Sequence, residues 1–355
     1  TQTNLGADLS LFKGRLSLSA DYWTKDTKDL LFQVALPNTS GYESFVTNIG
    51  EVSNKGFDFQ LGGTIIKNDN FSWNSDFNIS FINNKVKKLP GGNDIQQTER
   101  YLFGGVVSIL REGESLGSFY LYESNGVFST AKEAAEAGYI DKISKSNGGQ
   151  PVAGDARWVD QNKDGVIDTK DKIIAGNPIP DFTGGLNNTF KYKGLSLDAF
   201  FQFSKGNDVY NNFRTDLVRG FNTNYLKENL DAWKQEGDIT DVPRNVLLDP
   251  ANNSEGVVAR PSTRFLEDGS FIKLKTVTLT YEFPNSVLEK LKLSGLKVYA
   301  KGTNLLTITK YSGFDPEVSV AQNNNAGQNG GFQFGIDRGL YPLSKSITLG
   351  LSLDF

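Results

Sequence analysis

Apolar residues alternate strictly with small or polar ones over the last nine residues of the chain, from Ile347 to Phe355. Successive side chains of a β-strand point to opposite faces, so this pattern predicts a strand with one apolar and one polar face. A strand that crosses a bilayer needs only about 9–11 tilted residues. The segment therefore fits a closing strand of an outer-membrane β-barrel, with apolar side chains toward lipid and small polar ones toward the lumen.

The same alternation recurs earlier in the chain and predicts four further strands, at 15–22, 71–81, 195–203 and 277–283. Aromatic residues stand at the ends of these segments, as they do in the interfacial girdles of membrane barrels. Soluble β-sandwiches and barrels also show alternation. The pattern by itself leaves both classes open.

The connections between predicted strands are either very short or very long. Tight turns are expected at 13–14, 67–70 and 193–194. Long polar stretches rich in Gly and Asn cover 84–105, 123–178, 206–269 and 311–340. Short turns on one side and long extracellular loops on the other are typical of an outer-membrane barrel. The expected fold class is all-β, a transmembrane antiparallel β-barrel of which roughly ten strands lie in this chain.

Two short helices are expected within the long loops. The segment 224–237 places Leu226, Leu230 and Trp233 at i, i+4 and i+7, after an asparagine cap and before a terminal glycine. The segment 130–137 is rich in Ala, Glu and Lys, which favour helix. Such helices would order the extracellular loops so that they could grip a ligand or a lid. The simpler interpretation is that the apolar face of the first helix packs on the barrel rim.

Composition narrows the function classes. No apolar run reaches 18 residues, so no helix is expected to cross a bilayer. The chain has no Cys and no His, which removes thiolate chemistry, the commonest general base and the commonest transition-metal ligand. A net charge of −4 and a pI near 5.2 argue against a nucleic-acid partner.

One catalytic motif occurs, and the rest of the chain argues against it. Gly113 to Gly117 matches the G-x-S-x-G nucleophile elbow, in which a serine lies next to a histidine base. The chain contains no histidine, and the following residues, 118–122, predict a strand where an elbow requires a helix. No pair of carboxylates stands out among the 41 acidic residues as a glycosidase pair. We therefore expect no enzymatic activity.

The sharpest local motif is the acidic loop 160–171, with the sequence DQNKDGVIDTKD. It matches the calcium-loop pattern D-x-[DN]-x-[DN]-G, in which glycine at position 6 allows a sharp turn. Position 12 is Asp rather than the bidentate Glu of a high-affinity EF-hand, so we predict a structural calcium site and not a sensor. The expected ligands are Asp160, Asn162, Asp164, Val166, Asp168 and Asp171. The alternative is a turn whose carboxylates are only solvated.

Aromatic residues in the loops are candidate ligand contacts, because an aromatic face can stack on a sugar ring or a peptide side chain. These candidates are Trp158, Tyr210, Phe213, Phe221 and Tyr225. Aromatic residues also serve as ordinary loop anchors.

Four sequence blocks, taken together, resemble one family. They are 113–128, 154–182 from GDARWVD through the acidic loop to GNPIPDF, 264–275 with RFLEDGSFIKLK, and NLLT at 304–307 with YSGFDPE at 311–317. With the terminal strand they cover most of 105–355, in the order typical of the SusC/RagA group of TonB-dependent outer-membrane transporters. This chain departs from the family pattern at Leu121, where glycine is usual.

The resemblance implies more than the strands alone. Family members have about 22 strands around a plug domain, which follows a segment that contacts TonB. Residues 1–355 would then form the C-terminal part of the barrel, with the plug domain and TonB-contacting segment absent from this chain. The resemblance also implies a location in the outer membrane, in contact with its lipid. The implied function is TonB-energised import of an oligosaccharide or peptide, with a SusD-like lipoprotein as lid.

Two other readings of the sequence stay open. A soluble β-sandwich stabilised by calcium, acting as a glycan-binding protein or glycanase, would be recovered in the soluble fraction. A barrel without a transport role, such as an adhesin or an assembly pore, would reside in the membrane without depending on TonB.

Overall fold

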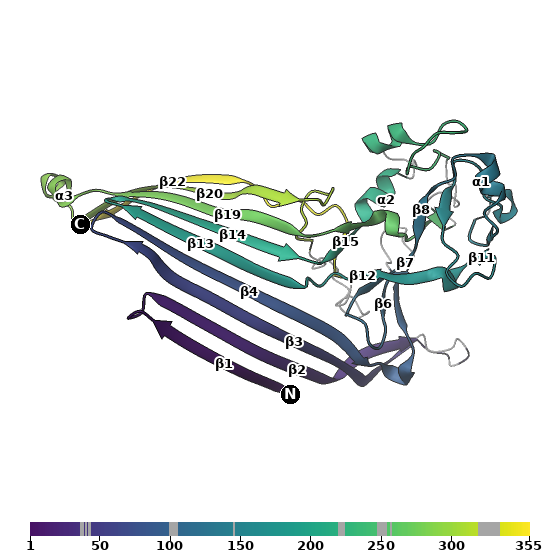
Figure 1. The fold of residues 1–355 in the computed structure, drawn as a ribbon, viewed down its shortest axis with the longest axis horizontal. Coiled ribbons are helices and arrows are strands. Elements are labelled where there is room, and N and C mark those ends of the chain that lie inside the picture. The colour runs from purple at the N-terminus through teal and green to yellow at the C-terminus, as the bar shows by residue number, and fades with distance from the viewer. Residues whose placement is uncertain are drawn as a thin grey trace.

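Nine long strands form one antiparallel sheet in sequential order (Figure 1). The computed structural model describes residues 1–35, 39, 41, 44–98, 106–144, 146–218, 224–246, 254–255, 258–318 and 334–355. The strands of the sheet are β1 (Gln2–Leu11), β2 (Leu16–Ala35), β3 (Ser44–Lys67), β4 (Phe71–Lys88), β13 (Phe182–Tyr192), β14 (Leu195–Lys205), β19 (Phe271–Glu282), β20 (Gly295–Thr309) and β22 (Ser346–Asp354). All five strands predicted from alternation fall within this sheet.

The two ends of the sheet differ. One end carries the predicted tight turns and the short helix α3 (Asn285–Leu291) between β19 and β20. The other end carries all the long insertions, which gather into a folded mass of small strands and helices on the right of Figure 1. The asymmetry expected from loop lengths is therefore present.

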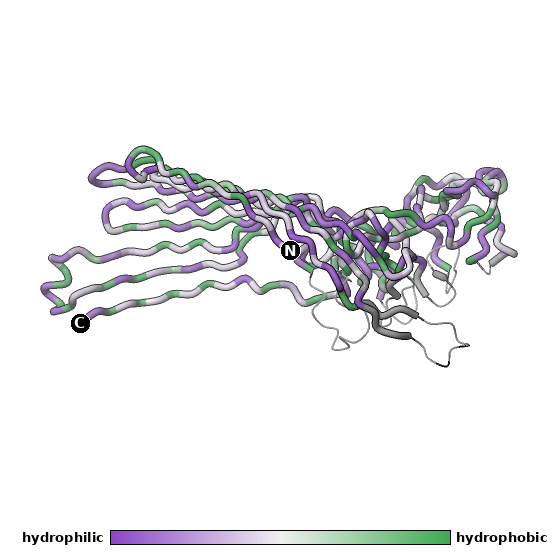
Figure 2. Tube along the Cα trace, turned by 90° about the horizontal axis from the view of Figure 1, so that it is seen from below, coloured by the Kyte–Doolittle hydropathy of each residue, from purple (hydrophilic) through white to green (hydrophobic). Residues whose placement is uncertain are grey.

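Register across the sheet separates an apolar face from a polar face. One continuous row of directly opposed residues runs over eight strands as Leu9, Leu18, Leu61, Phe77, Leu186, Phe201, Leu274 and Leu306. The neighbouring row runs as Asp8, Ser19, Gln60, Asn78, Gly185, Gln202, Lys273 and Thr307. Figure 2 shows the alternation of hydrophilic and hydrophobic residues along the strands that are seen apart from one another. Apolar side chains on the first face are open to the surroundings, for example Leu349 at 78% exposure.

Aromatic residues mark both ends of the apolar face. Phe81 and Phe182 lie with ring centroids 5.6 Å apart toward the loop end. Phe71 is paired in register with Tyr192 toward the turn end. Phe182 and Tyr192 are ten residues apart on β13, which is about 33 Å along a strand. A tilt of 35–45° reduces this span to about 25 Å, the height of the apolar band of a membrane barrel.

The loop end contains its own small elements. Those before β13 are η2 (Pro90–Gly92), β5 (Ile95–Thr98), β6 (Val106–Leu110), β7 (Ser118–Tyr122), β8 (Ser124–Val127), α1 (Ala131–Ala135), β9 (Ile140–Asp141), η3 (Ser146–Gly149), β10 (Ala156–Trp158), β11 (Val166–Ile167), η4 (Thr169–Asp171) and β12 (Lys172–Gly176). Those after β14 are β15 (Asp208–Asn211), α2 (Asn212–Val218), η5 (Lys227–Asp231), β16 (Ser254–Glu255), β17 (Val258–Ala259), η6 (Thr263–Phe265), β18 (Leu266–Asp268) and β21 (Ile336–Asp337).

The two larger apolar clusters of the described residues lie among these elements, and each joins several of them. The first loop core consists of Val107, Phe119, Leu121, Tyr210, Val218, Phe265 and Ile336. The second loop core consists of Tyr122, Phe128, Ala134, Tyr139, Ala156, Trp158 and Ile167. The long loops are therefore folded structure and not loose connections.

Of the two predicted helices, one is confirmed and one is wrong. α1 forms where expected, and the Thr130 hydroxyl accepts a hydrogen bond from the Glu133 N–H at 3.2 Å as its cap. The segment 224–237 contains only the single 3-10 turn η5. Its apolar residues do not share one face, because Leu226 packs against the first loop core whereas Leu230 is 70% exposed. Within the described ranges, no helix is long and apolar enough to cross a membrane.

Candidate functional site

A small pocket opens where α2 meets the segment after β20. β15 leads directly into α2, and the side-chain oxygen of Asn211 accepts a hydrogen bond from the Arg214 N–H at 3.0 Å, which fixes the first turn. Phe213 of α2 lies against Phe314, with ring centroids 5.7 Å apart and planes at 41°. The pocket has a volume of about 120 Å³ and is lined by Asn211, Phe213, Arg214, Leu217, Leu226, Ser312, Gly313 and Phe314.

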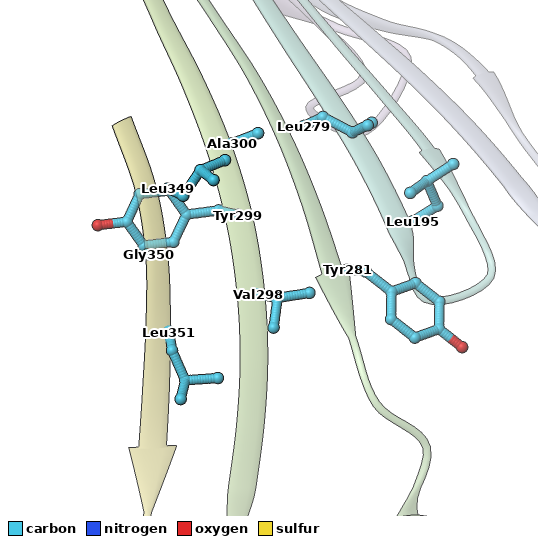
Figure 3. Close-up of a pocket in the computed structure, with 9 residues that line it drawn as sticks. All are labelled: Leu195, Leu279, Tyr281, Val298, Tyr299, Ala300, Leu349, Gly350 and Leu351. Atoms are coloured by element: carbon cyan, nitrogen blue, oxygen red, sulfur yellow. The ribbon is translucent and has the colours of Figure 1, made fainter. Parts of the chain in front are cut away.

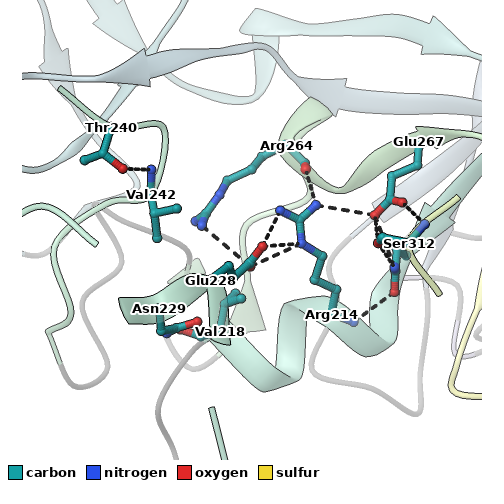
Figure 4. Close-up of polar contacts among 10 residues, drawn as sticks. Arg214, Val218, Glu228, Asn229, Thr240, Val242, Arg264, Glu267 and Ser312 are labelled. Carbon is teal, nitrogen blue, oxygen red and sulfur yellow. Dashed lines mark hydrogen bonds and ion pairs between the residues drawn. The ribbon is translucent and has the colours of Figure 1, made fainter. Parts of the chain in front are cut away.

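Behind the pocket lies a network of ion pairs centred on Arg214 (Figure 4). The Arg214 guanidinium donates to the Glu228 carboxylate through Nη2 at 2.7 Å and through Nε at 3.0 Å. Its Nη1 donates to Glu267 Oε1 at 3.3 Å and to the Arg264 carbonyl at 3.2 Å. Burial would lower the pKa of Arg214, but these carboxylates outweigh burial and raise that pKa above its ordinary value.

Glu267 joins this network to the other wall of the pocket. It accepts hydrogen bonds from the Ser312 N–H and hydroxyl, both at 2.8 Å, and from the Asn211 side-chain amide at 3.2 Å. The same amide also donates to the Ser312 hydroxyl at 3.3 Å. The polar groups around the pocket are thus bound to one another, and the surface left for a ligand is mainly that of Phe213, Phe314 and two leucines.

The segment 311–317 is fixed to the polar face of the sheet. Lys273 of β19 is 2% exposed, and its Nζ lies 2.5 Å from Asp315 Oδ1 and 2.6 Å from Glu317 Oε2. Lys275 adds a second ammonium at 2.7 Å from Glu317 Oε2. Lys273 stands in the polar row, opposite Gln202. The pocket therefore lies above the polar face, at the loop end of the sheet.

The five predicted ligand aromatics do not form one site. Trp158 and Tyr210 are 4% and 1% exposed and belong to the two loop cores, so neither ring offers a face to a ligand in this conformation. Phe213 is half-buried and lines the pocket. Tyr225 is 53% exposed but does not line it. Phe221 lies outside the described residues.

Trp158 has a clear packing role. The Arg260 guanidinium lies 4.4 Å from the centroid of the Trp158 ring and 5.6 Å from that of Tyr122. Arg260 is fully buried, and its Nη1 lies 2.8 Å from Asp141 Oδ2, an ion pair without the angle of a hydrogen bond. A stacked cation that is also ion-paired explains why this tryptophan is enclosed.

The acidic loop adopts a tight turn held by its own carboxylates. Asp160 Oδ2 accepts from the Gly165 N–H at 2.8 Å, and Asp164 Oδ1 accepts from the Val166 N–H at 3.0 Å. Asp171 is fully buried and accepts from the N–H groups of Gln161 and Asp168. Gly165 has a φ of +78°, as the sharp turn of the motif requires. Asn162 and Asp164 are exposed, and Asp168 is half-buried.

One feature of the loop favours a metal site and another does not. Asp160 Oδ1 is buried without a hydrogen-bond partner, which is compatible with a role as an oxygen ligand of a cation. However, in the described part of the chain no three His, Cys, Asp or Glu side chains are gathered closely enough to hold a metal ion. The oxygen donors are of the type that calcium prefers.

A larger hollow lies elsewhere and does not belong to this site. It has a volume of about 540 Å³, and its lining residues are Leu195, Leu279, Tyr281, Val298, Tyr299, Ala300, Leu349, Gly350 and Leu351 (Figure 3). Register places Leu279, Ala300 and Leu349 directly opposite one another on the apolar face. This hollow is a gap between outward apolar side chains, so we assign it to contact with lipid.

Of the eight residues that line the pocket, only Phe213 is among the aromatic candidates chosen from the sequence. The most informative of the residues missed are Arg214 and Phe314. The signal for Phe314 was the block YSGFDPE at 311–317, which the sequence comparison singled out without giving it a role. Arg214 had no sequence signal, because its carboxylate partners come from separate segments.

Comparison with known proteins places these features in context. Residues 1–305 match the family model described as TonB dependent receptor-like, beta-barrel. TonB-dependent receptor P3 of Formosa agariphila is 38% identical over 100% of this chain and 34% of its own length. TonB-dependent receptor SusC of Bacteroides thetaiotaomicron is 27% identical over 100% of this chain and 32% of its own length. The chain thus spans about a third of the length of these curated relatives.

Among solved structures, that of the RagAB peptide transporter is similar over the whole chain. It superimposes with a TM-score of 0.76 and 29% sequence identity, covering 100% of this chain and 35% of that one.

Proposed function

We propose, since this chain belongs to the TonB dependent receptor-like β-barrel family, that it supplies wall and outer mouth to a SusC/RagA-type importer of the outer membrane. One observation carries the proposal. A sheet with a continuous apolar row and a continuous polar row ends, on one side only, in a folded cap that stands above the polar face. Such a sheet fits a bilayer on one face and an aqueous path on the other.

The rest of the barrel must continue this sheet. Within the described residues β1 and β22 are its edges, and an open sheet edge in lipid would leave backbone N–H and C=O groups unsatisfied at several kcal/mol each. We infer that further strands close the barrel, that a plug domain fills it, and that TonB supplies the energy for import. The family membership supports this arrangement.

The ligand is proposed to be an oligosaccharide or a peptide, held beneath a SusD-like lipoprotein lid. The similarity to SusC and to the RagAB peptide transporter supports this choice. No covalent chemistry is required of the chain for such a function.

Calcium is proposed as a structural cofactor of the loop 160–171, bound by Asp160, Asn162, Asp164, the Val166 carbonyl, Asp168 and Asp171. The partnerless oxygen of Asp160 supports it. When bound, calcium would supply positive charge that offsets the crowded carboxylates and the entropy cost of ordering the loop. Asp160→Ala with Asp164→Ala should lower the bound calcium by one ion per receptor and increase proteolysis within 160–171. Unchanged calcium content in that variant would refute the site.

The import proposal is tested with the full-length protein in its native cells. Deletion of the receptor should abolish growth on one class of nutrient, and deletion of TonB should have the same effect. Recovery of the receptor in the soluble fraction would support the β-sandwich alternative. Outer-membrane location with TonB-independent behaviour would support an adhesin or assembly pore instead.

A further inference from the structure

We propose that the pocket beside the Phe213–Phe314 pair is a subsite that selects an apolar side chain of a peptide ligand. This inference rests on the import function proposed above and deepens it. Three features of the pocket support it: its size, the pairing of the polar groups around it, and its position above the polar face.

The size of the pocket matches one side chain and not a whole nutrient. Its volume is about 120 Å³. A dry apolar cavity of about 150 Å³ binds benzene, whereas sites for whole drug-sized ligands occupy roughly 300–1,000 Å³. The pocket can therefore accept one group of about the size of a leucine or phenylalanine side chain.

The chemistry of the lining disfavours a sugar ring. Recognition of sugar hydroxyls needs free donors and acceptors, but the polar groups here already bind one another. Arg214 is bound to Glu228 and Glu267, and the Asn211 amide is bound to Glu267 and Ser312. A hydroxyl placed in the pocket would lose its water without gaining an equivalent partner, which costs about 1–3 kcal/mol. An apolar side chain carries no such cost.

The position of the pocket points to the transported ligand as its occupant. Phe314 immediately precedes Asp315, which is ion-paired to Lys273 on the polar face of β19. Phe314 is 60% exposed, so one face of the pocket is open at the loop end of the sheet. This ring therefore lies beside the polar face, along which an imported ligand would enter.

Phe213 is held so that the pocket is formed before a ligand binds. Gly339 has a φ of +78°, and a Cβ at that position would lie 2.7 Å from Phe213 Cδ2. The absence of a side chain there lets the ring pack closely. Preformed pockets avoid part of the ordering cost of binding.

The test uses the purified full-length receptor with its lid protein and synthetic pentapeptides Ser-Gly-X-Gly-Ser, in which X is Phe, Leu or Ser. Burial of an apolar side chain should favour X = Phe or Leu over X = Ser by about tenfold or more in affinity. Phe314→Ala should reduce this ratio to about threefold or less, because one wall is lost. Phe314→Leu should retain most of the preference. Ile239→Ala, a change at a 97% exposed apolar residue outside the pocket, is the matched control and should leave the ratio unchanged.

The outcomes separate this inference from the import function. The inference would be overturned if the affinity ratio of the Phe or Leu peptide to the Ser peptide were unchanged in Phe314→Ala. It would also be overturned if Ile239→Ala reduced that ratio equally. Binding of maltohexaose but of none of the peptides would overturn it too, while TonB-dependent uptake of that sugar would leave the import function intact. Loss of lid binding in Phe314→Ala, with peptide preference unchanged, would show that the pocket receives the lid protein and would also overturn the inference.

Discussion

Replacement of Lys273 by Met tests whether buried charge fixes the loop end to the sheet. Lys273 is 2% exposed, and its ammonium meets Asp315 and Glu317 at 2.5 and 2.6 Å. The methionine side chain is similar in length and polarity to the aliphatic stem of lysine, but it carries no charge. Asp315 then loses its lysine partner, whereas Glu317 retains Lys275 at 2.7 Å.

The expected cost follows from the burial of the three groups. Removal of one partner of a buried ion pair typically costs about 3–5 kcal/mol. The side chains of Asp315 and Glu317 are 17% and 26% exposed, so water would solvate part of the uncompensated charge. We therefore expect about 2–3 kcal/mol, which is a factor of roughly 30–150 in the equilibrium for local opening.

Hydrogen exchange on the full-length receptor measures this opening directly. The peptide that covers 311–317 contains the Ser312 N–H, bound to Glu267 at 2.8 Å, and the Glu317 N–H, bound to Asp315 at 2.9 Å. Its exchange should accelerate by the factor above in Lys273→Met. Lys205→Met removes an ion pair of 3.4 Å whose side chains are 55% and 40% exposed, so it should have little effect on this peptide. Acceleration of less than about fivefold in Lys273→Met would refute the reasoning.

Three further predictions concern other parts of the molecule. Burial would raise the pKa of Glu317, but its two lysine partners outweigh burial and hold that pKa below the ordinary value, so the stabilisation is present at neutral pH and is lost as pH falls through the lowered pKa. The difference in exchange of 311–317 between wild type and Glu317→Gln should therefore shrink and disappear as pH falls through this lowered pKa, below the ordinary range of a glutamate. Arg260→Lys should destabilise the second loop core by about 2 kcal/mol, because a lysine cannot both stack on Trp158 and keep the ion pair, and exchange at 156–158 reports it. Gly350→Val should lower the amount of folded receptor in the membrane, since a Cβ there would lie 2.1 Å from Tyr299 Cζ, and Tyr299→Ala in the same chain should restore it; the heat-dependent gel mobility of the barrel measures both.

The strands of the barrel wall could be predicted from sequence, because one face of each strand contacts lipid and this requires an apolar residue at every second position. Every strand predicted from alternation lies within the nine-stranded sheet, and the predicted turns lie at one end. The strand predicted at 118–122 is also present, as β7 of a separate four-stranded sheet. The comparisons confirm the SusC/RagA type and the outer-membrane location expected from four sequence blocks. Between the bulges of a strand, a residue faces lipid or the lumen according to its parity, so little tertiary information is needed.

The structure of the loop end was less predictable, because the conformation of its residues depends on contacts with distant segments. The pattern at 224–237 has helical spacing, yet Trp233 donates its backbone N–H to the Val242 carbonyl at 3.0 Å and its indole N–H to the Ser129 carbonyl at 3.1 Å. These tertiary contacts override the local preference. Trp158, Tyr210 and Phe213 are all aromatic residues in predicted loops, so the sequence does not distinguish them. Only the fold shows that Trp158 and Tyr210 are buried.

The continuity of the sheet also constrains where a ligand can travel. β13 and β14 are paired at eleven consecutive positions, from Phe182 with Lys205 to Tyr192 with Leu195. Antiparallel pairing supplies about one backbone hydrogen bond per pair, and each group left unsatisfied in lipid costs several kcal/mol. Parting these two strands would therefore cost tens of kcal/mol, far more than binding of a nutrient can provide. Under the import function proposed above, a ligand would follow the polar face instead. The contacts that decide its passage would then be those at the loop end above that face, where the Phe213 and Phe314 pocket lies near the Lys273 ion pairs.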